Sequence, residues 1–172
     1  MVLKGKKVIV IGERDGVQGP AIETCIRSAG AEPILVLTQC FVWTAAGALD
    51  LEGQEAIKGT VEQHGKNDLL VLLGSPDANS AELYAETLTN GDPSWAGPLA
   101  GVSLGLPVYH IMEPEISAQI DTEVYKEHLE FLEIALDVKK ITEGLNRVRQ
   151  KNSTLNSWVP IRICFINMGW SG

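Results

Sequence analysis

Short apolar runs alternate with amphipathic segments four times along the chain. Four runs of aliphatic and β-branched residues predict strands, at residues 7–12, 33–37, 68–74 and 107–112. These runs lack the apolar–polar alternation of a half-exposed strand, and continuous runs are typical of parallel strands covered on both faces. The segments that follow them predict helices, at residues 20–29, 51–64, 79–88 and 122–150.

Residues at the ends of these segments support the predicted boundaries. Pro20 suits the first turn of a helix, where its missing N–H costs nothing, and Gly30 suits the end of the same helix. Asp77 or Ser75 is expected to cap the third helix. The last helix is predicted as one long segment, and its apolar stripe comprises Val124, Leu129, Leu132, Ile134, Leu136, Ile141, Leu145 and Val148.

The alternation of strands and helices predicts the fold class. It indicates an α/β protein with a parallel sheet of four or five strands in a three-layer sandwich, flavodoxin-like or Rossmann-like, in a single domain. Ligand sites in such sheets lie at the carboxyl ends of the strands. We therefore expect the loops that begin near Arg14, Cys40 and Ser75 to meet at one edge of the sheet.

Composition narrows the class of protein. The 172 residues are 45% hydrophobic and 21% charged, which is typical of a globular domain. The net charge of −8 argues against a nucleic acid partner, because phosphate binding needs clustered Lys and Arg. No apolar run approaches the roughly 18 residues of a membrane span, and residues 1–7 lack the apolar region of a signal peptide. We expect a cytoplasmic protein without a membrane partner.

The cysteines and histidines suggest neither a disulfide framework nor a metal site. The three cysteines have no zinc-site spacing, and Cys25 is expected to be a small buried side chain facing the sheet. The three histidines are far apart and are interpreted as surface or hydrogen-bonded core residues. The loop at residues 12–16 lacks both the Gly-x-Gly-x-x-Gly spacing and the Walker lysine. No bound cofactor is expected.

A candidate redox site follows the second predicted strand. Cys40 is the first residue of a Cys-x-x-X segment in which X is Trp43. Two redox groups at this spacing meet across a short loop, so that one attacks a substrate and the other resolves the product. An indole has one N–H donor and no redox-active atom. Taken alone, Cys40 is more often structural than catalytic, and Trp43 is more often an aromatic anchor that packs the loop.

The sequence around Cys40 carries a family resemblance. Residues 40–52 read Cys-Phe-Val-Trp-Thr-Ala-Ala-Gly-Ala-Leu-Asp-Leu-Glu, and this loop resembles the active loop of protein A, or selenoprotein A, of the glycine/sarcosine/betaine reductase complex. Further similar segments occur in the same order, at residues 5–16, 19–23, 30–32, 71–74, 86–93, 96–102 and 108–110. The resemblance covers residues 1–150 as one α/β domain, and residues 151–172 form a divergent tail of unknown role.

The resemblance implies a reaction and partners. In the family, position 43 is selenocysteine, and its selenolate takes a carboxymethyl group from substrate held on protein B. Protein C converts this group into acetyl phosphate, while Cys40 and the selenium form a selenenyl sulfide that thioredoxin reduces. Cys40 and position 43 are therefore the expected catalytic residues, and proteins B and C and thioredoxin are the expected partners.

Because Trp43 occupies the selenocysteine position, the activity that the resemblance implies need not be one that this chain can perform. A selenocysteine codon differs from a tryptophan codon by one base, and our hypothesis is that Trp43 stands in place of selenocysteine by substitution, recoding or translation convention. The chain is then expected to fold but not to form the carboxymethyl intermediate.

Two further interpretations stay open from the sequence. The first is a non-enzymatic, flavodoxin-like ligand-binding module, although the loop after the first strand lacks the Ser/Thr-rich phosphate-binding pattern. The second concerns residues 90–101, which are dense in Gly and Pro; a long structured loop of this kind is usually functional. We expect it to dock a partner, with Trp95 as an anchor.

Overall fold

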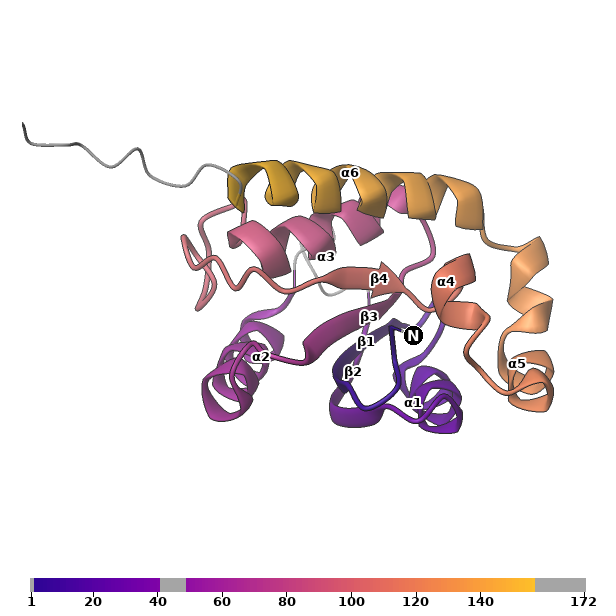
Figure 1. Ribbon diagram of the computed structural model, residues 1–172. Helices are drawn as coiled ribbons and strands as arrows, with labels where there is room; N and C mark the ends of the chain where they lie inside the picture. The colour runs from indigo at the N-terminus through magenta and orange to yellow at the C-terminus, as the bar shows by residue number, and fades with distance from the viewer. Residues whose placement is uncertain (1, 41–48, 157–172) are drawn as a thin grey trace, which may run out of the picture.

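A four-stranded parallel sheet forms the centre of the molecule. The computed structural model describes residues 2–40 and 49–156. The strands are β1 (Lys7–Glu13), β2 (Glu32–Gln39), β3 (Leu69–Gly74) and β4 (Val108–His110), and their order in the sheet is β2-β1-β3-β4 (Figure 1). All three strand pairs are parallel, which confirms the predicted α/β fold class.

Helices flank the sheet on both faces. The chain moves from β1 to β2 in one direction and then from β2 through β3 to β4 in the other, so right-handed crossovers place α1 (Gly19–Ser28) opposite α2 (Leu51–His64) and α3 (Ala78–Asn90). Neighbouring positions of β1 confirm this arrangement. Glu13 bonds Tyr84 of α3, whereas the Cα of Gly12 faces the start of α1.

Local residues explain where the helices begin and end. The Asp77 side chain accepts the N–H groups of Asn79 and Ser80, which confirms one of the two predicted caps of α3. Asp50 caps α2 in the same way, and Gly65 ends that helix with φ +74. A single turn, α4 (Pro114–Ser117), follows β4 and was not predicted.

The prediction of one helix over residues 122–150 is wrong. The segment divides into α5 (Thr122–His128), a 3₁₀ helix η3 (Glu130–Ile134) and α6 (Val138–Asn156). Figure 1 shows α5 beside α1 and α6 along α3, and a straight helix cannot pack on both. The Asp137 side chain accepts the N–H of Lys140 at 3.2 Å, so it caps α6 where the prediction had helix interior. Ile134, expected in the apolar stripe, is 94% exposed.

Buried polar residues tie β4 to the rest of the core. The Nε2 of His110 lies 3.1 Å from the Ser75 carbonyl oxygen, and its Nδ1 accepts the N–H of Met112 at 3.2 Å. Both contacts suit the neutral ring protonated at Nε2. Complete burial lowers the pKa of His110 to about 4, because removal from solvent disfavours the charged form of the ring.

His110 is expected to make the fold acid-sensitive. Its pKa is about 4 in the folded chain and about 6.5 when exposed, so the unfolded chain binds more protons between these values and stability falls as the pH drops from 6.5 to 4. The loss approaches about 3 kcal/mol at 1.36 kcal/mol per pKa unit. Urea unfolding at pH 7.5 and pH 4.5 measures it. Burial raises the pKa of Glu13, which works in the opposite sense, so a His110→Gln variant is needed to isolate the His110 share. An equal pH dependence in both proteins would contradict the assignment.

Candidate redox site

Cys40 lies at the carboxyl end of β2. The N–H of Arg14 donates to the Gln39 carbonyl oxygen at 3.0 Å, so the backbone beside Cys40 is held against the end of β1. The thiol is free and the residue is partly buried. Of the two expected catalytic positions, this is the one that the structure describes, since Trp43 lies outside the described residues. Cys40 stands at the sheet edge where parallel folds hold their functional groups.

A buried carboxyl group lies at the same edge. Glu13 is paired in register with Gln39, and it is 2% exposed. The Tyr84 hydroxyl donates to its Oε1 at 2.9 Å, and Ser80 Oγ lies 3.5 Å from its Oε2. Burial raises the pKa of Glu13, and the nearby carboxylate of Asp77 raises it further. Cys40 thus follows a residue, Gln39, that is paired with a carboxyl group whose pKa is raised, so this group holds its proton to higher pH than usual.

Sequence reasoning did not single out Glu13. A polar residue directly after the apolar run at residues 7–12 is an ordinary strand end in a sequence. Its burial depends on Tyr84, 71 positions away in the chain, so no local pattern could identify it.

The space between the ends of β1 and β3 is filled by the chain itself. The N–H of Val17 donates to the Gly74 carbonyl oxygen at 2.8 Å, which folds the loop after β1 over the end of β3. A Cβ on Gly16 would lie 2.1 Å from that oxygen, and one on Gly74 would lie 2.0 Å from the Val17 carbonyl oxygen. Doubly wound sheets bind ligands where the strand order reverses, here between β1 and β3. This packing disfavours a phosphate or flavin site at that point.

A residue in the first turn of α2 forms hydrogen bonds both to Leu49 and to the loop at residues 91–101. Gln54, buried within α2, donates from Nε2 to the Leu49 carbonyl oxygen and to Asp92 Oδ2, both at 3.1 Å. Its Oε1 accepts the N–H of Leu99 at 3.0 Å. One side chain therefore fixes the residue that follows the 41–48 segment and two points of the later loop. Sequence reasoning missed Gln54 because its partners are distant in the chain.

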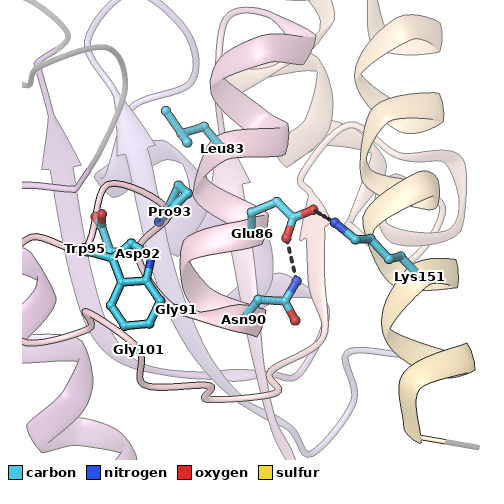
Figure 2. A pocket seen from close by; sticks show the side chains of 9 residues that line it. All are labelled: Leu83, Glu86, Asn90, Gly91, Asp92, Pro93, Trp95, Gly101 and Lys151. Carbon is cyan, nitrogen blue, oxygen red and sulfur yellow. Dashed lines mark hydrogen bonds and ion pairs between the residues drawn. The ribbon is translucent and has the colours of Figure 1, made fainter. Parts of the chain in front are cut away.

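Trp95 projects from this loop. It is 77% exposed, and its φ of +58 lies in the left-handed region, which costs a residue with a side chain about 1 kcal/mol or more. Its ring lies against Gly101, where an added Cβ would come within 3.0 Å of it. The ring lines a hollow of about 460 Å³, and Figure 2 shows how the lining side chains lie around it. Leu83 and Pro93 contribute apolar surface to this hollow, and an ion pair between Glu86 and Lys151 borders it.

Other candidates are structural where the structure describes them. Cys25 is fully buried, which confirms the predicted core residue, and burial raises the pKa of its thiol to about 11. His110 is a hydrogen-bonded core residue, as one of the two interpretations had it. Across residues 2–40 and 49–151, no group of His, Cys, Asp and Glu side chains is arranged to hold a metal ion. Among the described helices, none has the length and apolarity needed to cross a bilayer.

Comparison with known proteins decides the family. The family model described as glycine reductase complex selenoprotein A matches residues 3–149. The chain belongs to this family. It is similar to glycine/sarcosine/betaine reductase complex component A of Symbiobacterium thermophilum, with 54% identity over 88% of this chain and 97% of the relative. Component A of Gottschalkia purinilytica is also 54% identical, over 87% of this chain and 99% of the relative. Component A of Treponema denticola is 52% identical, over 87% and 95%.

Family membership confirms the resemblance seen in the sequence. The chain is a selenoprotein A component of the reductase complex, and as such part of an oxidoreductase system with other subunits. No solved structure matches the chain significantly. The described residues therefore supply the geometry at Cys40, and the family supplies the kind of complex to which the chain belongs.

Proposed function

We propose that this chain is built as the redox carrier of the complex, with Cys40 as the resolving thiol and position 43 as the nucleophile site. The observation that carries the proposal is the free, partly buried Cys40 at the carboxyl end of β2, in a chain of this family. A partly exposed thiol at the carboxyl end of a strand stands at the edge of the sheet, where a carrier can meet larger partners in turn.

The proposed reaction uses selenium at position 43. The selenolate attacks the α-carbon of glycine held as a Schiff base on protein B, a Se–C bond forms, and the C–N bond breaks. On protein C the carboxymethyl group is reduced to an acetyl unit that leaves as acetyl phosphate. In this step the Cys40 thiolate attacks the selenium, so that a Se–S bond forms and the Se–C bond breaks with its electron pair on the carbon, which takes up a proton. One carboxylate oxygen leaves as water when the acetyl unit is joined to phosphate, and Cys40 and the selenium are left as a selenenyl sulfide. Thioredoxin returns the pair to its reduced state.

Trp43 removes the nucleophile from this scheme. An indole cannot form the Se–C bond or accept a sulfur from Cys40. The chain with Trp43 is therefore proposed to be an inactive form of the carrier. The described domain is expected to keep its fold, because side chains of β1, β3 and α3 form a fully buried core within residues 2–40 and 49–156. Residues 1–150 are proposed as the carrier domain, and residues 151–172 receive no role.

A Trp43→Cys variant tests the pairing of the two positions. We expect Cys40 and the new cysteine to form an intramolecular disulfide on mild oxidation, because a Cys-x-x-Cys spacing allows closure, and we expect thioredoxin to reduce it. Loss of two free thiols and of two hydrogen atoms in the intact mass measures closure. Cys25 serves as an internal reference, since burial keeps its thiol protonated.

A matched control separates this pair from other oxidations. The double variant Trp43→Cys, Cys40→Ser keeps one thiol of the pair and should stay unclosed under the same conditions. If the single variant fails to close, or if the disulfide resists thioredoxin, the proposed resolving role of Cys40 is wrong.

The proposal also covers compartment and cofactor. A carrier that must return to its reduced state suits the cytoplasm, where thiols are kept reduced. No resident small molecule is needed, because the substrate stays on protein B. The alternative of a flavodoxin-like binding module is disfavoured by the loop that fills the space between β1 and β3.

A further inference from the structure

Two exposed apolar side chains lie on segments that touch. Leu51, in the first turn of α2, is 60% exposed, and Trp95 is 77% exposed. The loop that carries Trp95 contacts this turn at Gly97, where an added Cβ would lie 2.6 Å from Leu51 Cδ2. Pro93 and Ala96 are exposed as well. We call Leu51, Pro93, Trp95 and Ala96 the Trp95 patch.

Hydrogen bonds of the buried residue Asp92 support this patch. Asp92 is buried, and its Oδ1 accepts the N–H of Ser94 at 2.8 Å while its Oδ2 accepts from Gln54. The N–H of Trp95 donates to the Asp92 carbonyl oxygen at 3.1 Å. The fold thus uses buried hydrogen bonds to hold a large aromatic residue outward in a left-handed conformation. An exposed tryptophan on a preorganised loop is the usual anchor of a protein interface.

A hollow lies beside Trp95, so the patch combines a projecting side chain with a recess. Figure 2 shows Leu83 and Pro93 on the same side as the indole, with Glu86 across the hollow, bonded to Asn90 and Lys151. A partner side chain that enters the hollow would contact the indole and Leu83 together. A raised aromatic beside a recess provides two complementary points of contact.

The patch is connected to the redox segment. The first turn of α2 contacts both, because a Cβ on Gly53 would lie 3.1 Å from Gln39 Nε2, and Gln54 bonds Leu99 in the Trp95 loop. Gln39 directly precedes Cys40. A protein that covers the patch therefore lies one helical turn from the chain segment that carries the thiol.

The negative charge around the Trp95 patch indicates that a partner surface with positive charge would fit it. Three exposed carboxylates, Asp50, Glu52 and Glu55, lie on or next to the first turn of α2, and the whole chain has a net charge of −8. We propose that the Trp95 patch is the docking surface for another protein of the reductase complex, one with an apolar recess bordered by Lys and Arg. The partners tested, proteins B and C, come from the proposed function, whereas the patch itself does not depend on residue 43.

Binding measurements with purified proteins test the proposal. The chain is immobilised through its C-terminus, and proteins B and C are titrated separately. With Trp95→Ala we expect about 30-fold or greater loss of affinity for at least one of them, as for an interface anchor. Added salt is expected to weaken the unchanged chain's binding, because the border of the patch is acidic. Trp95→Phe should retain part of the affinity.

Phe131→Ala is the matched control. Phe131 is also an exposed aromatic residue, at 63%, but it lies on η3, next to α5 rather than α2. The Phe131→Ala variant should bind proteins B and C with the affinity of the unchanged chain. Equal thermal unfolding midpoints should show that all variants are folded. Unchanged affinity of Trp95→Ala for both proteins overturns the docking surface alone. Equal losses in both alanine variants also overturn it. Absence of binding by the unchanged chain overturns it together with the proposed partners.

Discussion

Selenocysteine at position 43 is expected to restore acetyl phosphate formation, and the chain with Trp43 is expected to form none. The selenolate is the group that forms the bond to carbon, so its absence removes a covalent step rather than weakening it. Removal of an essential nucleophile lowers turnover by roughly 1000-fold or more. Acetyl phosphate is measured with proteins B and C, glycine, phosphate and a thioredoxin system.

Two variants show which step each position serves. Trp43→Sec should turn over repeatedly. The double variant Trp43→Sec, Cys40→Ser should take up the carboxymethyl group, seen as added mass on the chain, and should not complete a turnover, because no thiolate is present to attack the selenium and break the Se–C bond. Equal acetyl phosphate formation by the chains with Trp43 and with selenocysteine would refute the nucleophile role of position 43.

Loss of the Glu113 carboxylate is expected to destabilise the fold by about 3–5 kcal/mol. Glu113 is 1% exposed and holds the Arg149 guanidinium with two parallel bonds, of 3.0 and 2.7 Å. Arg149 also donates to the Val108 carbonyl oxygen at 2.7 Å and lies 4.5 Å from the centre of the Tyr109 ring. The pair therefore joins α6 to β4. Glu113→Ala leaves this guanidinium largely buried without its anion.

A surface ion pair between α3 and α6 supplies the control for this effect. Glu82 pairs with Arg147, and both side chains are partly exposed. Glu82→Ala should cost about 1 kcal/mol or less, because water screens an exposed pair. Urea unfolding of the two variants and the unchanged chain measures the difference. Similar losses in both variants would show that burial does not govern the strength of the Glu113 pair.

The order of elements could be predicted because its signals are local. Each strand has its own apolar run, and helix ends have their own signals at Pro20, Gly65 and Asp77. The prediction of one long helix over residues 122–150 was wrong because it also relied on local signals alone. The apolar positions at residues 124–148 keep helical spacing. However, α5 packs on α1 and α6 packs on α3, and the sequence pattern does not specify which helix each segment contacts.

The candidate site was predictable only where chemistry is contained in a short motif. Cys40 and position 43 belong to one short sequence segment, so the resemblance of that segment to the family's active loop was enough to suggest a redox pair. Glu13, Gln54 and Arg149 have partners 71, 38 and 36 positions away. Such contacts form when helices pack on the sheet, and no local pattern identifies the two members of each pair.

The sequence by itself determined the α/β class, the family and the place of Cys40 at the end of a strand, since periodicity and short motifs act over a few residues. Only the tertiary structure decided which polar groups are buried together and that the loop after β1 covers the end of β3. It also decided that Trp95 is exposed, on a loop held by hydrogen bonds of Asp92. These features depend on the packing of distant segments, because burial is a property of the whole fold rather than of any one residue.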